Sequence, residues 1–281
     1  REAGAPEGVF QNLIIHHDKV AGILENPIIK AVTLTGSERA GASVAAAAGK
    51  NIKKSLLELG GSNAFVVLAD ANIDKASDVA VTARFMNAGQ SCIAAKRFIV
   101  LEEVYDEFVE KFTSKVALLR SGDPMAEDSK IGTLSRADFA DSLNKQVTDS
   151  IKMGAKLVLG GEHNGAYFAP TILTNVEAHM SVFQEETFGP VAPICKVKTV
   201  KEAFEVAKDT TFGLGISVFT EDLVKVKDYI KWVPDGAFFV NDLVKSDPRL
   251  PFGGTGKSGF GRELSKEGIL EFVNIKTVYI K

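Results

Sequence analysis

The sequence predicts an α/β fold with mostly parallel open sheets and helices on both faces. Short apolar or β-branched runs alternate with longer charged segments of helical spacing, which is typical of this class. The composition agrees, because 45% hydrophobic and 25% charged residues are ordinary for a globular protein. At roughly 100 to 200 residues per domain, a length of 281 residues indicates one large domain or two smaller ones.

The first strand–turn–helix–strand unit is expected near the start of the chain. An apolar run over residues 28–35 ends in a Thr-Gly-Ser turn, an Ala-rich helix is expected over 39–48, and a second strand over 55–59. Gly36 and Ser37 lie where this helix begins, and the free N–H groups of a helix N-terminus bind phosphate. The turn lacks the full Gly-x-Gly-x-x-Gly fingerprint, so Ser37 is equally well interpreted as a plain N-cap.

Strands and helices continue to alternate through the rest of the chain. A turn is expected at Asp123 and Pro124, and the glycines between residues 253 and 261 predict an irregular loop. A helix over 266–272 and an apolar strand over 274–280 close the chain. The remaining strands are expected over residues 64–68, 98–101, 167–173, 191–197, 215–220 and 237–241, and the remaining helices over 74–87, 105–119, 138–153, 200–208 and 222–231.

Charge, hydropathy and cysteine usage exclude several classes of protein. Thirty-three basic and 36 acidic residues give a formal charge of -3, which argues against nucleic acid or an anionic membrane as the main partner. No apolar run approaches the roughly 20 residues that span a bilayer. Two cysteines and no basic, apolar leader favour a reducing, cytoplasmic setting. The four histidines have no ligand spacing, so no metal site is expected.

Two residues are candidates for chemistry from their local sequence. Cys92 lies at an element boundary, where backbone N–H groups can lower a thiol's pKa and bind an oxyanion, although a lone cysteine is more often a small core residue. Glu58 is flanked by leucines and followed by two glycines, so partial burial would raise its pKa and suit it to act as a general base. A solvent-facing carboxylate is the alternative.

Four ordered motifs together resemble the signature of the aldehyde dehydrogenase superfamily. They are Leu-Glu-Leu-Gly-Gly at 57–61, Gly-Gln-Ser-Cys at 89–92, Glu-Glu-Thr-Phe-Gly-Pro at 185–190 and the Gly-rich segment 251–263. The segments 92–98 and 246–252 look most like the shorter succinate-semialdehyde dehydrogenases. Members of this superfamily are much longer, so the resemblance implies that the N-terminal part of the cofactor domain is missing from this chain.

The resemblance implies a role for individual residues. Cys92 would be the nucleophile that forms a thiohemiacetal and then a thioester, and Glu58 the general base that activates water. The cofactor would be NAD or NADP, with its pyrophosphate at Gly36 and Ser37. Its nicotinamide half would contact Leu59, Gly60, Glu186 and Phe188.

The substrate implied is a small aldehyde, with succinate semialdehyde as the specific candidate. Asn241 and Phe252 would line the substrate tunnel, and Glu263 would be a proton-relay acid. Ser246 and Arg249 could bind a distal carboxylate, although Met86 stands where some relatives carry an arginine.

The resemblance also implies a domain organisation. Residues 1–60 would be the remnant of a Rossmann-like NAD(P)-binding domain, 61–262 the catalytic domain, and 263–281 a C-terminal helix and oligomerisation strand. Addition of that strand to a neighbouring subunit predicts a homo-oligomer, a dimer or tetramer. Two rival functions stay open: a non-catalytic structural or binding fragment, and a cysteine hydrolase or acyltransferase that uses Cys92 without nicotinamide.

Overall fold

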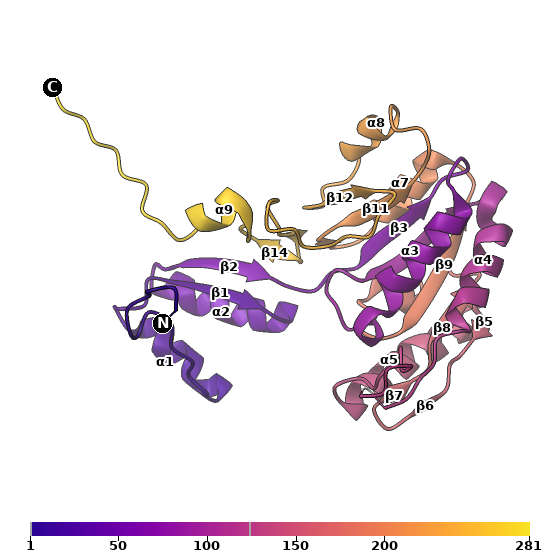
Figure 1. Cartoon of the computed structure of the whole chain (residues 1–281), viewed down its shortest axis with the longest axis horizontal. Helices are drawn as coiled ribbons and strands as arrows, with labels where there is room; N and C mark the ends of the chain where they lie inside the picture. Colours follow the sequence, from indigo (N-terminus) through magenta and orange to yellow (C-terminus); the bar gives the residue numbers. More distant parts are fainter. Residues whose placement is uncertain (1, 124) are drawn as a thin grey trace.

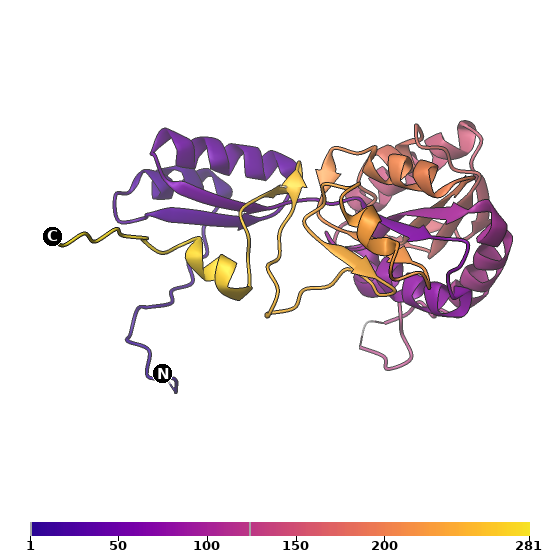
Figure 2. The same ribbon diagram turned by 90° about the horizontal axis from the view of Figure 1, so that it is seen from above.

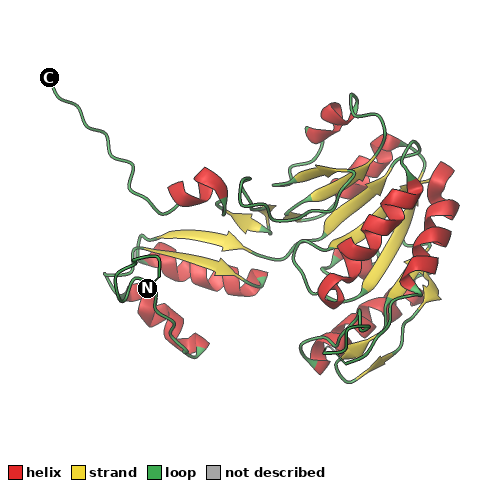
Figure 3. Cartoon of the chain, viewed as in Figure 1, coloured by secondary structure: helices red, strands yellow, loops and turns green. Residues whose placement is uncertain are grey.

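The computed structural model describes residues 2–123 and 125–281, so Arg1 and the second residue of the expected Asp123-Pro124 turn lie outside it. The described chain forms two main sheets flanked by helices, together with two small two-stranded sheets, which confirms the α/β prediction (Figures 1 and 3). A narrow region joins the part with the smaller sheet to the part with the larger one, as both ribbon views show (Figures 1 and 2).

The smaller sheet pairs β1 (Ala31–Thr35) with β2 (Lys54–Glu58) in parallel, and β14 (Gly259–Phe260) with β2 antiparallel. Helix α2 (Glu38–Lys50) connects β1 to β2 and packs on both of them. Helix α1 (Val20–Glu25), preceded by a 3-10 turn at His17–Lys19, packs on α2. The predicted first unit is therefore confirmed, although the strands are a few residues shorter or shifted.

The larger sheet has seven strands among the described residues, in the order β12-β11-β3-β4-β9-β8-β5. Neighbouring strands are parallel except for β5 at one edge, which pairs antiparallel with β8. The strands span Asn63–Val67 (β3), Ala95–Leu101 (β4), Lys156–Leu159 (β5), Thr171–Thr174 (β8), Val191–Val197 (β9), Ile216–Phe219 (β11) and Phe238–Val240 (β12).

Helices cover both faces of the larger sheet (Figure 1). α3 (Ile73–Phe85) and α4 (Glu102–Val116) lie on one face, and α7 (Val200–Lys208) packs on β3, β4 and β9 from the other. The remaining helices are Met86–Gly89 (a 3-10 turn after α3), Ala137–Lys152 (α5), Ser181–Gln184 (α6), Val226–Ile230 (α8) and Ser265–Leu270 (α9).

The core is centred on β3 and β4, where every residue is buried. Such continuous burial is typical of central strands in a parallel sheet that is covered on both faces. The rings of Phe65, Phe98, Phe108 and Phe219 pack here, with the centroids of Phe65 and Phe219 4.6 Å apart. The segment between α3 and β4, which contains Cys92, leads directly into this buried core.

Two sequence predictions are wrong, and a third is not tested by a single chain. The Gly-rich loop contains two short strands, β13 (Thr255–Gly256), which pairs with β10 (Phe212–Gly213), and β14. The run 167–173 is divided at Ala169 and Pro170 into β7 (Tyr167–Phe168), which pairs with β6 (His163–Asn164), and β8. Residues 274–280 form no strand within the described chain, and Figures 1 and 2 show this tail pointing away from the body. The strand expected here would pair with a neighbouring subunit, so it stays a prediction.

Candidate active site

The loop that carries Cys92 has an unusual backbone. Asn87 and Ala88 have φ values of 54° and 52°, and Gly89 follows with a φ of 73°. Non-glycine residues adopt this left-handed region at an energetic cost, and such residues cluster at functional sites. The Asn87 side chain supports the turn by donating to the carbonyl of Gln90 at 2.9 Å. Cys92 lies three residues after Gly89, and β4 begins at Ala95.

Buried Arg84, on α3, joins the Cys92 loop to the Glu-Thr-Phe-Gly-Pro loop. Its guanidinium donates to the carbonyls of Gly89 (3.3 Å) and Ala95 (2.9 Å) on one side. It donates to Thr187 O (3.0 Å) and to Gly189 O on the other. A Cβ added at Gly89 would collide with the carbonyl of Gly189, so the two loops touch directly.

Glu186 comes from the second loop and reaches the first. Its Oε1 lies 2.9 Å from the Nζ of buried Lys96 and accepts a hydrogen bond from Gly61 N at 3.1 Å. A Cβ at Gly60 would displace the Glu186 carboxylate, so this glycine leaves that side chain its present place. The Leu-Glu-Leu-Gly-Gly motif and the Glu-Thr-Phe-Gly-Pro motif therefore meet at Glu186.

Glu58 ends β2 and is 2% exposed. Within the described structure, neither of its carboxylate oxygens has a hydrogen-bond partner. Burial, with a smaller contribution from the negative charge of Glu263, raises the Glu58 pKa from its ordinary 4.5 to about 8, while Arg262 opposes this shift. A buried carboxyl with a pKa near the working pH is suited to accept a proton from water.

The Cys92 thiol is half-buried, and burial raises its pKa. The Lys96 charge and the Ile93 backbone act in the opposite direction, whereas Glu186 and Glu58 add to the rise. Glu58 and Glu186 are therefore close enough to Cys92 for their charges to affect its thiol.

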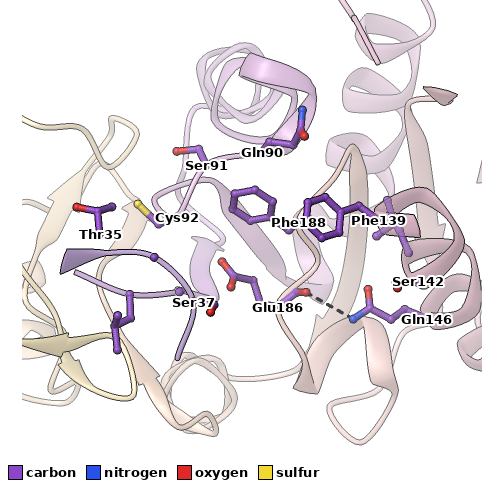
Figure 4. Close-up of a pocket in the computed structure, with 14 residues that line it drawn as sticks. Thr35, Ser37, Gln90, Ser91, Cys92, Phe139, Ser142, Gln146, Glu186 and Phe188 are labelled. Atoms are coloured by element: carbon purple, nitrogen blue, oxygen red, sulfur yellow. Dashed lines mark hydrogen bonds between the residues drawn. The ribbon is translucent and has the colours of Figure 1, made fainter. Parts of the chain in front are cut away.

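A cavity of about 630 Å³ lies between the smaller-sheet part and the larger-sheet part (Figure 4). Its walls contain Cys92 and all six residues predicted to bind cofactor. The lining consists of Thr35, Gly36, Ser37, Leu59, Gly60, Gln90, Ser91, Cys92, Phe139, Ser142, Leu143, Gln146, Glu186 and Phe188. The fold therefore brings Cys92 and the six residues predicted to bind cofactor together around one cavity.

The cavity is compatible with a nicotinamide dinucleotide. Helix α2 begins beside Gly36 and Ser37, so its positive dipole end lies at the wall. A Cβ at Gly36 would make only ordinary contacts at 3.8 Å, so the chain leaves space there. The Glu186 carboxylate offers acceptors for ribose hydroxyls, and Phe188, 40% exposed, offers an apolar ring.

The Gly-rich motif contacts the Glu58–Gly61 segment through Ser258. Ser258 Oγ donates to Gly60 O at 2.7 Å and accepts from Gly213 N at 3.1 Å, and Ser258 O accepts from Leu59 N at 3.0 Å. An added Cβ at Gly253 would lie 2.8 Å from Glu58 Oε1, so this glycine leaves the carboxylate its space.

The residues predicted to bind substrate do not line this cavity. The Asn241 amide exchanges two hydrogen bonds with the Thr220 backbone. Exposed Arg249 forms a two-point ion pair with Asp247, and Ser246 is exposed beside them. Phe252 and Glu263 form an isolated antiparallel bridge.

Sequence reasoning gave no site role to Lys96, Arg84 or the α5 residues Phe139, Ser142, Leu143 and Gln146. Thr35 belongs to the Thr-Gly-Ser turn that it singled out, and Gln90 and Ser91 belong to the Gly-Gln-Ser-Cys motif, where it assigned a role to Cys92 alone. A lysine followed by an arginine inside the apolar run of β4 was the available signal for buried cations. No comparable signal marked α5, because its exposed face looks like that of any amphipathic helix.

The described residues contain no group of three or more His, Cys, Asp or Glu side chains that could hold a metal ion. No helix within residues 2–123 and 125–281 is long and apolar enough to cross a membrane.

Comparison with known proteins gives consistent results. The family model described as "Aldehyde dehydrogenase family" matches residues 1–278. The "Succinate-semialdehyde dehydrogenase [NADP(+)] 1" of Mycobacterium tuberculosis (strain ATCC 25618 / H37Rv) is 46% identical over 280 residues, which are 99% of this chain and 61% of that protein. The "Succinate semialdehyde dehydrogenase [NAD(P)+] Sad" of Escherichia coli (strain K12) is 45% identical, with the same coverage of each chain.

Solved structures agree with the sequence matches. The succinic semialdehyde dehydrogenase of Streptococcus pyogenes in complex with NADP+ superimposes with a TM-score of 0.95 at 41% identity, covering 99% of this chain and 62% of that one. Lactaldehyde dehydrogenase from Escherichia coli gives a TM-score of 0.89 at 33% identity, covering 92% and 55%. The chain thus spans about three fifths of the length of the curated relatives that it matches.

Proposed function

Because the chain belongs to the aldehyde dehydrogenase family, we propose that the protein oxidises an aldehyde to a carboxylate with NAD+ or NADP+ through a covalent intermediate on Cys92. The observation that carries the proposal is the cavity in which Cys92, Glu186 and the N-terminal end of α2 meet, with Glu58 buried nearby. The relatives named above are described as NADP+ or NAD(P)+ enzymes, which supports this choice of cofactor.

Cys92 begins the proposed reaction. Its thiolate, favoured by the Lys96 charge, adds to the aldehyde carbonyl and forms a thiohemiacetal. NAD(P)+ would accept the hydride that the thiohemiacetal loses, and a thioester would remain on Cys92. Gly36 and Ser37 would hold the pyrophosphate, Glu186 the ribose, and Leu59, Gly60 and Phe188 the nicotinamide end.

Glu58 completes the reaction in this proposal. In its ionised form the carboxylate takes a proton from water, which attacks the thioester and releases the carboxylic acid. The buried oxygens of Glu58 have no protein hydrogen-bond partner in the described chain, so their capacity to accept a hydrogen bond is unused. Glu263, whose charge already acts on Glu58, is the proposed relay that receives the proton next.

We further propose succinate semialdehyde as the substrate, because several relatives carry that name. Asn241 and Phe252 would line the tunnel, and Ser246 and Arg249 would bind the distal carboxylate. Arg249 is bound to Asp247 in this structure, so the substrate would have to displace Asp247 or share the guanidinium with it. Met86, 50% exposed, supplies no second cation.

The domain and assembly predictions belong to the same proposal. Residues 1–60 would form part of the cofactor domain, residues 61–262 the catalytic domain, and residues 263–281 an oligomerisation segment. Several apolar side chains in the tail are exposed, such as Ile275 at 79% and Tyr279 at 81%, which favours pairing with another subunit in a dimer or tetramer. Both cysteines are free thiols, as expected in the cytoplasm.

Formation of reduced nicotinamide tests the proposed function. The protein as its gene encodes it is incubated with succinate semialdehyde and NADP+ or NAD+, beside a Cys92→Ala variant. Oxidation by the parent protein and none by the variant is expected. A folded parent that oxidises no aldehyde would instead favour the non-catalytic alternative, and cofactor-independent thioester hydrolysis would favour a cysteine hydrolase.

A further inference from the structure

Lys96 is a buried lysine at the second position of β4, and its ammonium lies inside the candidate site. The side chain is 0% exposed. Nζ donates to Ser91 O at 2.8 Å and to Cys92 O at 2.9 Å, and it lies 2.9 Å from Glu186 Oε1. An ammonium has three donors, and these three acceptors can use all of them.

Lys96, Glu186, Gly61 and the Cys92 main chain contact one another in succession. Glu186 Oε1, which pairs with Lys96, also accepts from Gly61 N at 3.1 Å. Gly61 in turn packs against Cys92, since an added Cβ there would lie 2.7 Å from Cys92 O. The centroid of the Phe188 ring lies 5.9 Å from Lys96 Nζ. The separation between nucleophile and ribose-binding carboxylate is therefore set through Lys96.

Burial of an ammonium destabilises the folded protein, because removing the charge from water costs several kcal/mol unless partners compensate for it. Burial lowers the Lys96 pKa to about 8, and the nearby Glu186 carboxylate acts to raise it. Arg84 acts to lower it. Lys96 thus remains largely charged at neutral pH.

The charged groups that act on the thiol come from three elements. Lys96 on β4 favours the thiolate, whereas Glu186 from the loop after α6 and Glu58 from β2 oppose it. Lys96 is therefore the cation that balances two carboxylates beside Cys92.

We propose that Lys96 is a positioning residue that couples the two halves of the site. Its ammonium fixes the Cys92 main chain against the Glu186 carboxylate and supplies the positive charge that stabilises the thiolate. This inference rests on the proposed function, in which Cys92 is the nucleophile and Glu186 binds the cofactor ribose.

The test compares Lys96→Met, Glu186→Gln and the double variant, all made in a Cys195→Ala background so that Cys92 is the only cysteine of these 281 residues, and the alkylation of Cys92 is followed on its own peptide by mass spectrometry. Arg97→Met is the matched control. Arg97 is the next residue on β4 and an equally buried cation, but its guanidinium donates to Ser62 O, Val206 O and Ala207 O instead.

Two readouts need no aldehyde turnover. The rate of Cys92 alkylation by iodoacetamide, followed from about pH 6 to about pH 10, gives the thiol pKa. Calorimetric titration with NADP+ gives the cofactor Kd. Both use the protein as its gene encodes it, and circular dichroism verifies that each variant is folded.

Lys96→Met is expected to raise the thiol pKa by about one unit or more, so that alkylation below both pKa values slows about tenfold. It should also weaken NADP+ binding. Adding Glu186→Gln should partly restore the thiol pKa, because it removes the carboxylate left unpaired. If Lys96→Met does not fold, Lys96→Gln, which keeps a hydrogen-bonding group but no charge, is judged by the same two readouts.

A thiol pKa and an NADP+ Kd in the Lys96 variant equal to those of Arg97→Met would overturn the proposal. The outcome is separable from that of the proposed function. A protein that oxidises no aldehyde would contradict the activity, whereas the alkylation profile would still report whether Lys96 acts on Cys92.

Discussion

Ser258 Oγ donates to Gly60 O at 2.7 Å, although the two residues are 198 positions apart in the chain. The same hydroxyl accepts from Gly213 N. Ser258 therefore joins the Gly-rich motif to the segment that carries Glu58, and also to the β10 end of the larger-sheet part. This contact between distant motifs helps to fix the Glu58–Gly61 segment against the larger-sheet part.

Ser258→Ala is expected to destabilise the protein by about 1–3 kcal/mol, because it leaves Gly60 O and Gly213 N buried without this partner. Urea denaturation followed by circular dichroism measures the change in the free energy of unfolding. Ser114→Ala, at an exposed position on α4, is the control and should change stability by less than about 0.5 kcal/mol. Equal stabilities for the two variants would contradict this role for Ser258.

Gly89→Ala is expected to reduce both stability and activity. The residue has a φ of 73°, and a new Cβ would collide with Gly189 O, so the Cys92 loop and the Glu186 loop would have to separate. Gly154→Ala controls for backbone strain alone, because its φ is 115° but nothing lies within 4 Å of an added Cβ. The Tm and kcat of both variants are compared. A Gly89→Ala enzyme as active as Gly154→Ala would show that contact between the loops is not needed.

The raised pKa of Glu58 predicts how stability depends on pH. Between pH 4.5 and about 8 the folded protein retains a proton on Glu58 that the unfolded chain releases, so folded stability falls as pH rises through this window. Glu58→Gln removes that dependence. The Tm of the variant minus the Tm of the parent protein should therefore increase from pH 5 to pH 8. A difference that stays constant over this range would contradict the buried, protonated state.

The same pKa predicts the pH profile of the second chemical step. In the proposed mechanism the hydrolysis of the thioester needs ionised Glu58, so its rate should rise with pH and level off above about 8. Single-turnover experiments with preformed acyl-enzyme measure this step separately from thiolate addition. The rate of thiolate addition has a pH dependence of its own, because burial raises the Cys92 pKa. A rate that continues to rise tenfold per pH unit above the Glu58 pKa would indicate attack by hydroxide without Glu58.

Periodicity along the sequence predicted the regular elements well wherever packing is local. The expected strand over 191–197 and helix over 200–208 coincide with β9 and α7, because each has a clear apolar pattern of its own. The strands β13 and β14 were missed. They form only because residues far away in the chain, Phe212–Gly213 and Leu57–Glu58, provide their partners.

The candidate site shows the same contrast between residues that a local motif marks and residues that only the three-dimensional packing marks. Gly36, Cys92 and Glu186 come from recognisable motifs, and the fold brings them to one cavity. Lys96 and Arg84 belong to no motif that names them as site residues, and their importance comes from burial, which is a property of the three-dimensional packing. The strand expected over 274–280 needs a neighbour that the described chain does not contain.

The most direct test of the central claim is the mass of the Cys92 peptide after the Glu58→Gln variant has been mixed with succinate semialdehyde and NADP+ or NAD+. Without the general base the thioester should accumulate, so a succinyl adduct on Cys92 is expected in nearly every molecule, together with one equivalent of reduced nicotinamide. The adduct should be absent when the oxidised cofactor is omitted. Unmodified Cys92 in the complete mixture, in a folded variant that binds the cofactor, would contradict the covalent mechanism.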